Sequence, residues 1–191
     1  MQKVNGFILI VIILMLPYFA IASNGNNTSI DSFKINDGNW YDDYFGEIQE
    51  PSLSQQRDNK KLHTYRFLWL RTFHSPICLR LIVNLDGTGK LIVKKTDGKG
   101  GYGIGKLVEN YTVNLSEEQV TIFIKKTKKA WYWMMPSKKE TLGLDGARWI
   151  LEGLKKGRYH VVERWSPEGG KFREAAECLI GLSKLDIEKI Y

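Results

Sequence analysis

The sequence predicts an α+β fold, in which an antiparallel sheet of about six strands carries two helices packed on one face. Two observations support it. Short β-branched and aromatic segments follow one another through tight-turn signals, and two later segments place apolar residues at helical spacing. The order is four strands, a helix, two strands and a helix. Strands joined by short turns pair as antiparallel hairpins, and 191 residues suit one domain.

The first four strands are expected at 63–73, 77–85, 89–96 and 102–114. In the first, Tyr65, Phe67 and Trp69 share one face and Leu68 and Leu70 share the other. Because both faces are largely apolar, this strand is expected to be covered on both sides. Asp-Gly pairs at 86–87 and 97–98 predict the hairpin turns that follow the second and third strands.

A helix is expected over about 117–130. Ser116 and Gln119 have the spacing of a capping box, acids begin the segment and lysines end it. The aromatic run from Trp131 to Met135 is predicted to plug the core at the end of this helix, and an aromatic cage for a ligand is the alternative. The closing helix is expected from Phe172 to Leu185, with a buried face that has Cys178 beside it.

Residues 1–22 have the features of a signal peptide. Lys3 precedes an apolar run from Phe7 to Leu16, and Ala20-Ile21-Ala22 fits the cleavage rule. Cleavage and export to the periplasm or the medium are expected; an uncleaved membrane anchor is the alternative. Residues 23–61 are predicted to be a polar, partly disordered leader, and the folded domain is expected at 62–191. The aromatic group Trp40, Tyr41, Tyr44 and Phe45 is predicted to hold the leader to the domain, and Gln49 to Lys61 to be a linker.

Cys78 and Cys178 are the two cysteines of the chain. In an exported protein an even number of cysteines favours a disulfide, and two buried thiols are the alternative. The sequence contains no CxxC and no Cys/His metal spacing. It predicts neither a metal site nor a cofactor.

The chain is basic, with a formal net charge of +7. Its lysines are scattered, and an exported protein rarely meets nucleic acid, so nucleic acid is not the expected partner. An anionic envelope ligand or a partner protein fits the charge better. Membrane association is expected if the N-terminal segment is not cleaved.

The segment from Gly143 to Pro167 is predicted to form a hairpin that carries the candidate site. A three-residue loop, Lys155 to Gly157, would place Glu152 opposite His160 and Arg148 opposite Arg164. These four side chains would then share one face with Ile150 and Val162. A one-residue shift of register would change which residues are opposite one another.

On that face a glutamate beside a histidine is a candidate acid–base pair, and two arginines suit a carboxylate or a phosphate. Weak catalytic candidates are therefore His160, Glu152 and Asp145. The binding candidates are Arg148, Arg164, Glu152 and His160. The alternative is ordinary cross-strand pairing on the solvent side of a sheet. Glu163, on the other face, is expected near the sheet edge or paired with a basic group.

Residues from about 63 to 185 resemble a group of exported bacterial proteins without an assigned function. The matching motifs are Gly143-Leu144-Asp145-Gly146, Trp149-Ile150-Leu151-Glu152-Gly153, Tyr159-His160-Val161-Val162 and Arg164-Trp165-Ser166-Pro167, with Gly100-Gly101-Tyr102 upstream. The resemblance implies a bacterial source and export, and it implies no activity.

Three hypotheses follow. The first is an exported, non-enzymatic binding protein, similar in kind to inhibitor and immunity proteins, that uses the hairpin face over 148–164. The second is a small hydrolase that uses His160 and Glu152 on an anionic substrate. The third is a scaffold tethered to the membrane by an uncleaved N-terminus.

Overall fold

A computed structural model describes residues 42–191 of the chain, apart from residues 140 and 142. Six antiparallel strands form one sheet in the spatial order β4-β3-β2-β1-β5-β6. The strands are β1 (His63–Arg71), β2 (Ile77–Val83), β3 (Gly89–Thr96), β4 (Leu107–Leu115), β5 (Ala147–Lys155) and β6 (Arg158–Trp165). The predicted fold class is confirmed.

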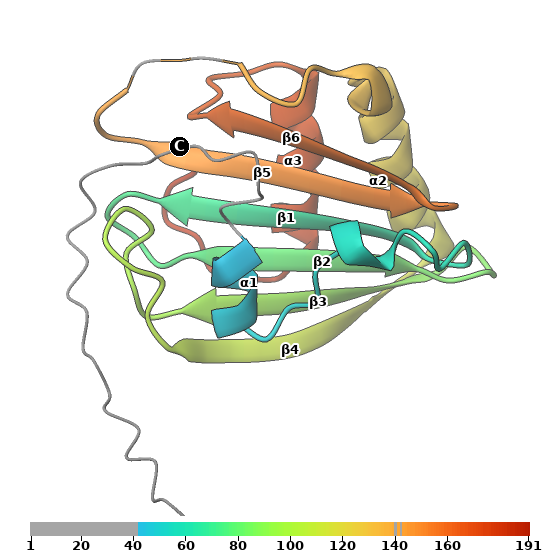
Figure 1. Cartoon of the computed structure of the whole chain (residues 1–191), viewed down its shortest axis with the longest axis horizontal. Helices are drawn as coiled ribbons and strands as arrows, with labels where there is room; N and C mark the ends of the chain where they lie inside the picture. The colour runs from blue at the N-terminus through green and yellow to red at the C-terminus, as the bar shows by residue number, and fades with distance from the viewer. Residues whose placement is uncertain (1–41, 140, 142) are drawn as a thin grey trace, which may run out of the picture. The chain divides into compact units, whose positions relative to one another are not determined.

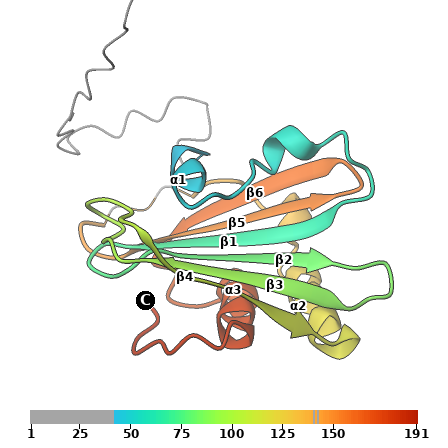
Figure 2. The same cartoon turned by 90° about the horizontal axis from the view of Figure 1, so that it is seen from below.

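Two long helices, α2 (Glu117–Lys129) and α3 (Lys171–Leu182), lie together on one face of the sheet (Figures 1 and 2). The capping box of α2 is formed, since the Ser116 side chain accepts from Gln119 N and the Gln119 side chain accepts from Ser116 N. The short helix α1 (Asp42–Glu47) lies on the opposite face of the sheet (Figure 2). Two 3₁₀ turns, η1 (Ser54–Gln56) and η2 (Tyr132–Met134), complete the regular elements of the described chain.

The larger core lies between the sheet and the two long helices. Alternate residues of β1, among them Tyr65, Phe67 and Trp69, pack there against Phe123 of α2 and Leu179 of α3. Leu68 and Leu70 point to the other face, where they form a second, smaller core with Phe45 and Ile48. All residues of β1 after His63 are buried, as its two apolar faces predict.

The segment that precedes β1 is folded onto the sheet and differs from the expected linker. Phe45, Ile48, Glu50 and Leu53 are each at most 6% exposed. Phe45 holds this segment to the domain, as predicted for the aromatic group, whereas Trp40 and Tyr41 lie outside the described residues. The polar composition of this segment suggested a linker, but Glu50 is buried because cations of the sheet pair with its carboxylate.

The expected disulfide between Cys78 and Cys178 is wrong, because the two cysteines lie on opposite faces of the sheet. Cys78 alternates along β2 with Ile77 and Leu79, so it faces the α1 side and is buried there. Cys178 belongs to α3 and packs against the larger core on the other side. Both are free thiols, which was the alternative, although Cys178 is only partly buried. Burial raises the pKa of each thiol.

Within the described part of the chain, no helix combines the length and the apolar character needed to cross a membrane. The predicted signal peptide and residues 23–41 of the polar leader lie outside the described residues.

Because the sheet separates the two thiols, the melting temperature is expected to be the same with and without dithiothreitol. Protein unfolded without reductant should titrate two thiols per chain with Ellman's reagent. Differential scanning calorimetry and the thiol titration check both points. A lower melting temperature on reduction, with fewer than two thiols titrated, would contradict the arrangement.

Candidate functional site

The turn between β5 and β6 has two residues, Lys156 and Gly157, in place of the expected three. Lys155 pairs directly with Arg158. Both turn residues have positive φ, 52° for Lys156 and 79° for Gly157, as a type I′ turn requires. Lys156 N also donates to Leu62 O at 3.4 Å, which holds the turn against the start of β1. Glu152 is therefore opposite Val161, and His160 is opposite Gly153.

This register divides the predicted binding face between the two sides of the sheet. Arg148 and Glu152 lie on the α1 side, whereas His160 and Arg164 lie on the side of α2 and α3. The predicted pairing of Glu152 with His160, and that of Arg148 with Arg164, are therefore wrong. The acid–base pair on which the hydrolase hypothesis depended is not formed, because a sheet separates its two members.

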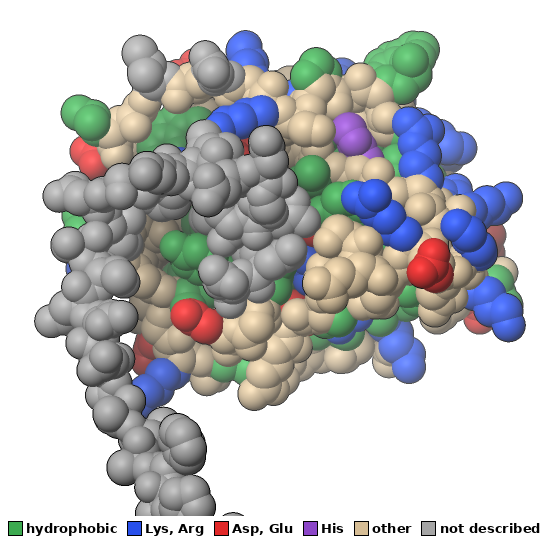
Figure 3. Space-filling model, viewed as in Figure 1, with side chains coloured by type: hydrophobic (Ala, Val, Ile, Leu, Met, Phe, Trp, Pro, Cys, Tyr) green, Lys and Arg blue, Asp and Glu red, His purple; other side chains and the backbone are tan. Residues whose placement is uncertain are grey.

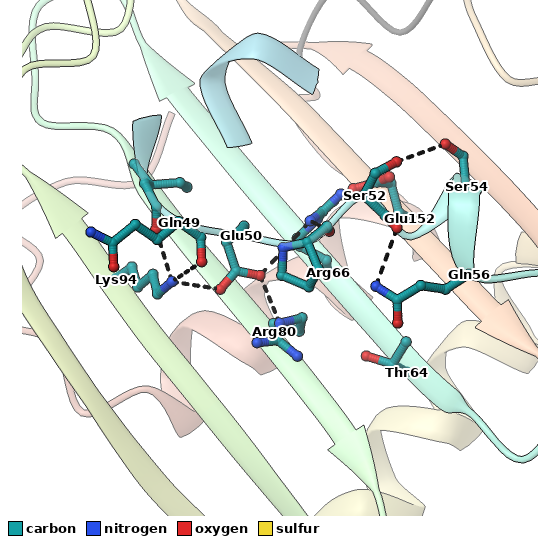
Figure 4. A network of polar contacts seen from close by, with 12 residues as sticks. Gln49, Glu50, Ser52, Ser54, Gln56, Thr64, Arg66, Arg80, Lys94 and Glu152 are labelled. Carbon is teal, nitrogen blue, oxygen red and sulfur yellow. Dashed lines mark hydrogen bonds and ion pairs between the residues drawn. The ribbon is translucent and has the colours of Figure 1, made fainter. Parts of the chain in front are cut away.

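Glu152 belongs to a cluster of buried charges on the α1 side (Figure 4). It is opposite Arg66 of β1, and Arg66 Nε donates to Glu152 Oε2 at 2.6 Å. The Tyr159 hydroxyl donates to Glu152 Oε1 at 2.8 Å. The side chains of Arg66 and Glu152 are 0% and 1% exposed, so this ion pair is fully removed from water.

A second carboxylate, that of Glu50, connects the N-terminal segment to this cluster. Its Oε2 accepts from Arg80 Nε at 2.6 Å, and its Oε1 is 3.0 Å from Lys94 Nζ (Figure 4). Lys94 Nζ also donates to the carbonyl oxygens of Ile48 and Gln49, at 2.8 Å each. Cations on the sheet thus bind both the backbone and the carboxylate of the segment. The cluster stabilises the fold and leaves no open site at Glu152.

The two predicted arginines are occupied by structural contacts. Arg148 donates to Glu163, which confirms that Glu163 pairs with a basic group on an edge strand. Arg164 donates to Pro136 O at 2.9 Å. Asp145 is exposed in the loop that precedes β5.

His160 holds the aromatic segment that follows α2. Its Nε2 lies 3.0 Å from Met135 O, and its ring lies 5.2 Å from that of Tyr132. Burial lowers the pKa of His160, and nearby Arg158 lowers it further. The neutral imidazole donates to the carbonyl, so this histidine has a structural role.

A cleft of about 370 Å³ lies on the helix side of the sheet, at the turn between β5 and β6. This volume is within the range of sites for small molecules. Tyr65, Trp133, Ile124 and Thr127 form its walls, and four cations line the rest: Lys128, Lys155, Lys156 and Arg158. Among the described residues, no acidic side chain lines it. We call it the basic cleft.

Gly153 and Arg158 position Trp133 in the basic cleft. A Cβ on Gly153 would lie 3.1 Å from the Trp133 ring and 3.0 Å from that of Tyr132, so glycine allows both rings to approach β5. Arg158 Nη2 donates to Trp133 O at 2.6 Å, and its guanidinium lies over the indole ring at 5.4 Å. Of the run predicted to plug the core, only Tyr132 is fully buried, and the prediction is wrong for Trp131 and Met134, which are exposed. Trp133 is half-buried and lines the cleft.

The surrounding charge is strongly positive. Lys and Arg side chains gather at the end of the sheet where the β5–β6 turn lies, on the right of Figure 3. Close by, burial lowers the pKa of His63 to about 4, and the charge of Lys155 contributes. Such a site can hold an anionic group by charge while its aromatic walls contact a flat or apolar body.

Reasoning from the sequence missed both the buried charge cluster around Arg66 and the cations of the basic cleft. Arg66 lies inside a strand that is apolar on both faces, and that position is itself a signal of a buried, paired charge. Lys155 and Lys156 were recognised only as part of a turn and Arg158 only as a strand residue, because their convergence with Trp133 depends on the register. Among the described residues, no group of three His, Cys, Asp or Glu side chains is placed to hold a metal ion.

Comparisons with protein-family models, with curated proteins and with solved structures found no match to this chain.

The buried ion pair predicts a large effect of Glu152→Gln. Removing one charge leaves Arg66 buried without its full partner, so the free energy of unfolding should fall by about 3 kcal/mol. Glu109→Gln is the matched control, because Glu109 pairs with Lys95 at the surface and should cost less than about 1 kcal/mol. Urea denaturation measures both variants. Equal effects would contradict the role of the cluster.

The pKa of His63 predicts a loss of stability in acid. The folded-state pKa, about 4, is below the ordinary value of 6.5, so the unfolded chain binds more protons between these values. The contribution of His63 to the free energy of unfolding is complete above pH 6.5 and decreases as the pH falls toward 4. Chemical denaturation at several pH values should show this fall in the wild type and a smaller fall in His63→Gln. Identical pH profiles would refute the assignment.

Proposed function

We propose that this chain is an exported, non-enzymatic binding protein that holds an anionic ligand in the basic cleft. The single observation that carries the proposal is the convergence of four cations and two aromatic rings on one cleft, with no acidic side chain among the described residues that line it. The sequence features of residues 1–22 support export, and an exported protein would meet its anionic ligand outside the cytoplasm.

The ligand is best described by its chemistry as a phosphate or carboxylate attached to a flat or apolar body. Lys155 and Lys156 supply the turn end of the cleft with positive charge, and Arg158 adds a guanidinium that suits oxyanions. Trp133 supplies accessible aromatic area at low entropic cost, since aromatic rings are rigid, whereas Tyr65 behind it is only 1% exposed. Binding without chemistry fits this set, because a lining of lysines, an arginine and aromatic rings contains no paired acid and base.

A small probe with both features tests the proposal. In the full chain, 1-naphthyl phosphate should bind, and 1-naphthol, which lacks the charge, should bind more weakly. The double variant Lys155→Glu, Lys156→Glu should weaken naphthyl phosphate binding by at least about tenfold, because it reverses two charges of the cleft. Isothermal titration calorimetry measures the affinities.

The matched control is Lys90→Glu, Lys106→Glu, which changes the net charge equally at two exposed lysines outside the cleft. It should leave the affinity within about twofold. Circular dichroism and thermal melting confirm that both double variants fold. Equal affinities of the wild type and the Lys155→Glu, Lys156→Glu protein would overturn the proposal.

A further inference from the structure

Beside the basic cleft, two large apolar side chains stand exposed to solvent. Trp131 is 71% exposed and Met134 is 73% exposed. Met134 N donates to Trp131 O at 2.9 Å within the turn that contains η2, and residues three apart in a 3₁₀ turn are eclipsed. Trp131 and Met134 are therefore joined by one turn, and both side chains are open to solvent.

The backbone at Trp131 is strained as well as exposed. Its φ is 53°, in the left-handed region that bulky residues rarely adopt. Trp131 N donates to Lys128 O at 3.0 Å, so the chain reverses immediately after α2 and directs the indole outward. An exposed tryptophan in a strained conformation gains nothing in the isolated protein, and this suggests that a partner covers it.

The surroundings of this pair are cationic. Between residues 125 and 139 the sequence has six lysines and no acidic residue. Five of them, Lys125, Lys128, Lys129, Lys138 and Lys139, are exposed. On α3, Glu174 binds Lys171 at 2.7 Å, and that bond, followed by the charges of Lys126 and Lys129, lowers the pKa of Glu174. In Figure 3 hydrophobic side chains protrude at the upper right, over the C-terminal end of α2, and Lys and Arg side chains lie directly below them.

We propose that Trp131, Met134 and the five exposed lysines form a docking surface for an anionic lipid bilayer. Tryptophan is favoured at the boundary between headgroups and acyl chains, where its ring is apolar and its N–H stays hydrated. Lysines around it are attracted to anionic headgroups, and the attraction weakens as salt screens it. Lysine is depleted in protein–protein interfaces relative to the rest of the surface, so five exposed lysines around one tryptophan favour a membrane as the occupant.

The docking surface does not depend on the cleft binding a ligand, because Trp131 and Met134 do not line the cleft. Lys128 belongs to both, so a docked molecule would open its cleft beside the headgroups. Vesicle binding and naphthyl phosphate binding are separate measurements, and either can fail without the other.

Quenching of tryptophan fluorescence by brominated lipid tests the docking. The full chain is mixed with vesicles that contain phosphatidylcholine and brominated phosphatidylglycerol in equal parts. Residues 1–22 contain no tryptophan, so insertion of that segment gives no signal. We expect quenching in the wild type and in Trp40→Phe, and its loss in Trp131→Phe. Unchanged quenching in Trp131→Phe overturns the proposal.

The contribution of the exposed lysines to vesicle binding is tested in the same assay. Lys138→Glu, Lys139→Glu should weaken vesicle binding by at least about tenfold, since each lysine near an anionic surface contributes to binding. The matched control Lys184→Glu, Lys189→Glu makes the same change at two exposed lysines near the C-terminal end and should bind within about twofold of the wild type. Equal binding of both double variants, or equal quenching by vesicles made only of brominated phosphatidylcholine, would overturn the anionic bilayer as the partner.

Discussion

The two-residue turn at Lys156 and Gly157 determines on which side of the sheet every side chain of β6 lies, while the pairing of β5 with β1 fixes the faces of β5. Side chains alternate along a strand, so one residue more or less in the turn would transfer each side chain of β6 to the opposite face. The observed turn places Tyr159 with Glu152, and it places Arg158 beside Trp133. The contact of β6 with the buried charge cluster and its share of the basic cleft are both consequences of this register.

The two faces of the sheet consequently have different roles: the α1 side holds the preceding segment, and the helix side carries the basic cleft. On the α1 side, Glu50 and Glu152 are enclosed by cations, and this enclosure fixes the segment before β1 to the domain. A buried ion pair adds little net stability over apolar residues, but losing one member is costly, so the cluster mainly specifies where the segment binds. On the helix side, the cations near the turn have no carboxylate among the cleft-lining residues, and they remain available to a ligand.

The fold could be predicted from the sequence, because its strongest signals are local. The capping box of α2, the Asp86-Gly87 turn and the alternation of β1 each depend on residues close in the chain. The hairpin register could not be predicted, because a lysine at positive φ is unusual in a type I′ turn, and its stability here depends on the contact with Leu62. The burial of Glu50 depends on cations 16 to 44 residues away, and its polar neighbours suggested a linker. The disulfide prediction failed for the same reason, since only the packing of α3 reveals that a sheet lies between the cysteines.

The most direct test of this account is the pattern of cross-strand proton contacts in β5 and β6, measured by nuclear Overhauser spectroscopy on the isotope-labelled chain. The account predicts backbone contacts that place His160 opposite Gly153 and Glu163 opposite Ile150. Contacts that place His160 opposite Glu152 would contradict it. They would restore the predicted acid–base pair and remove Arg158 from the side of the sheet on which the cleft lies.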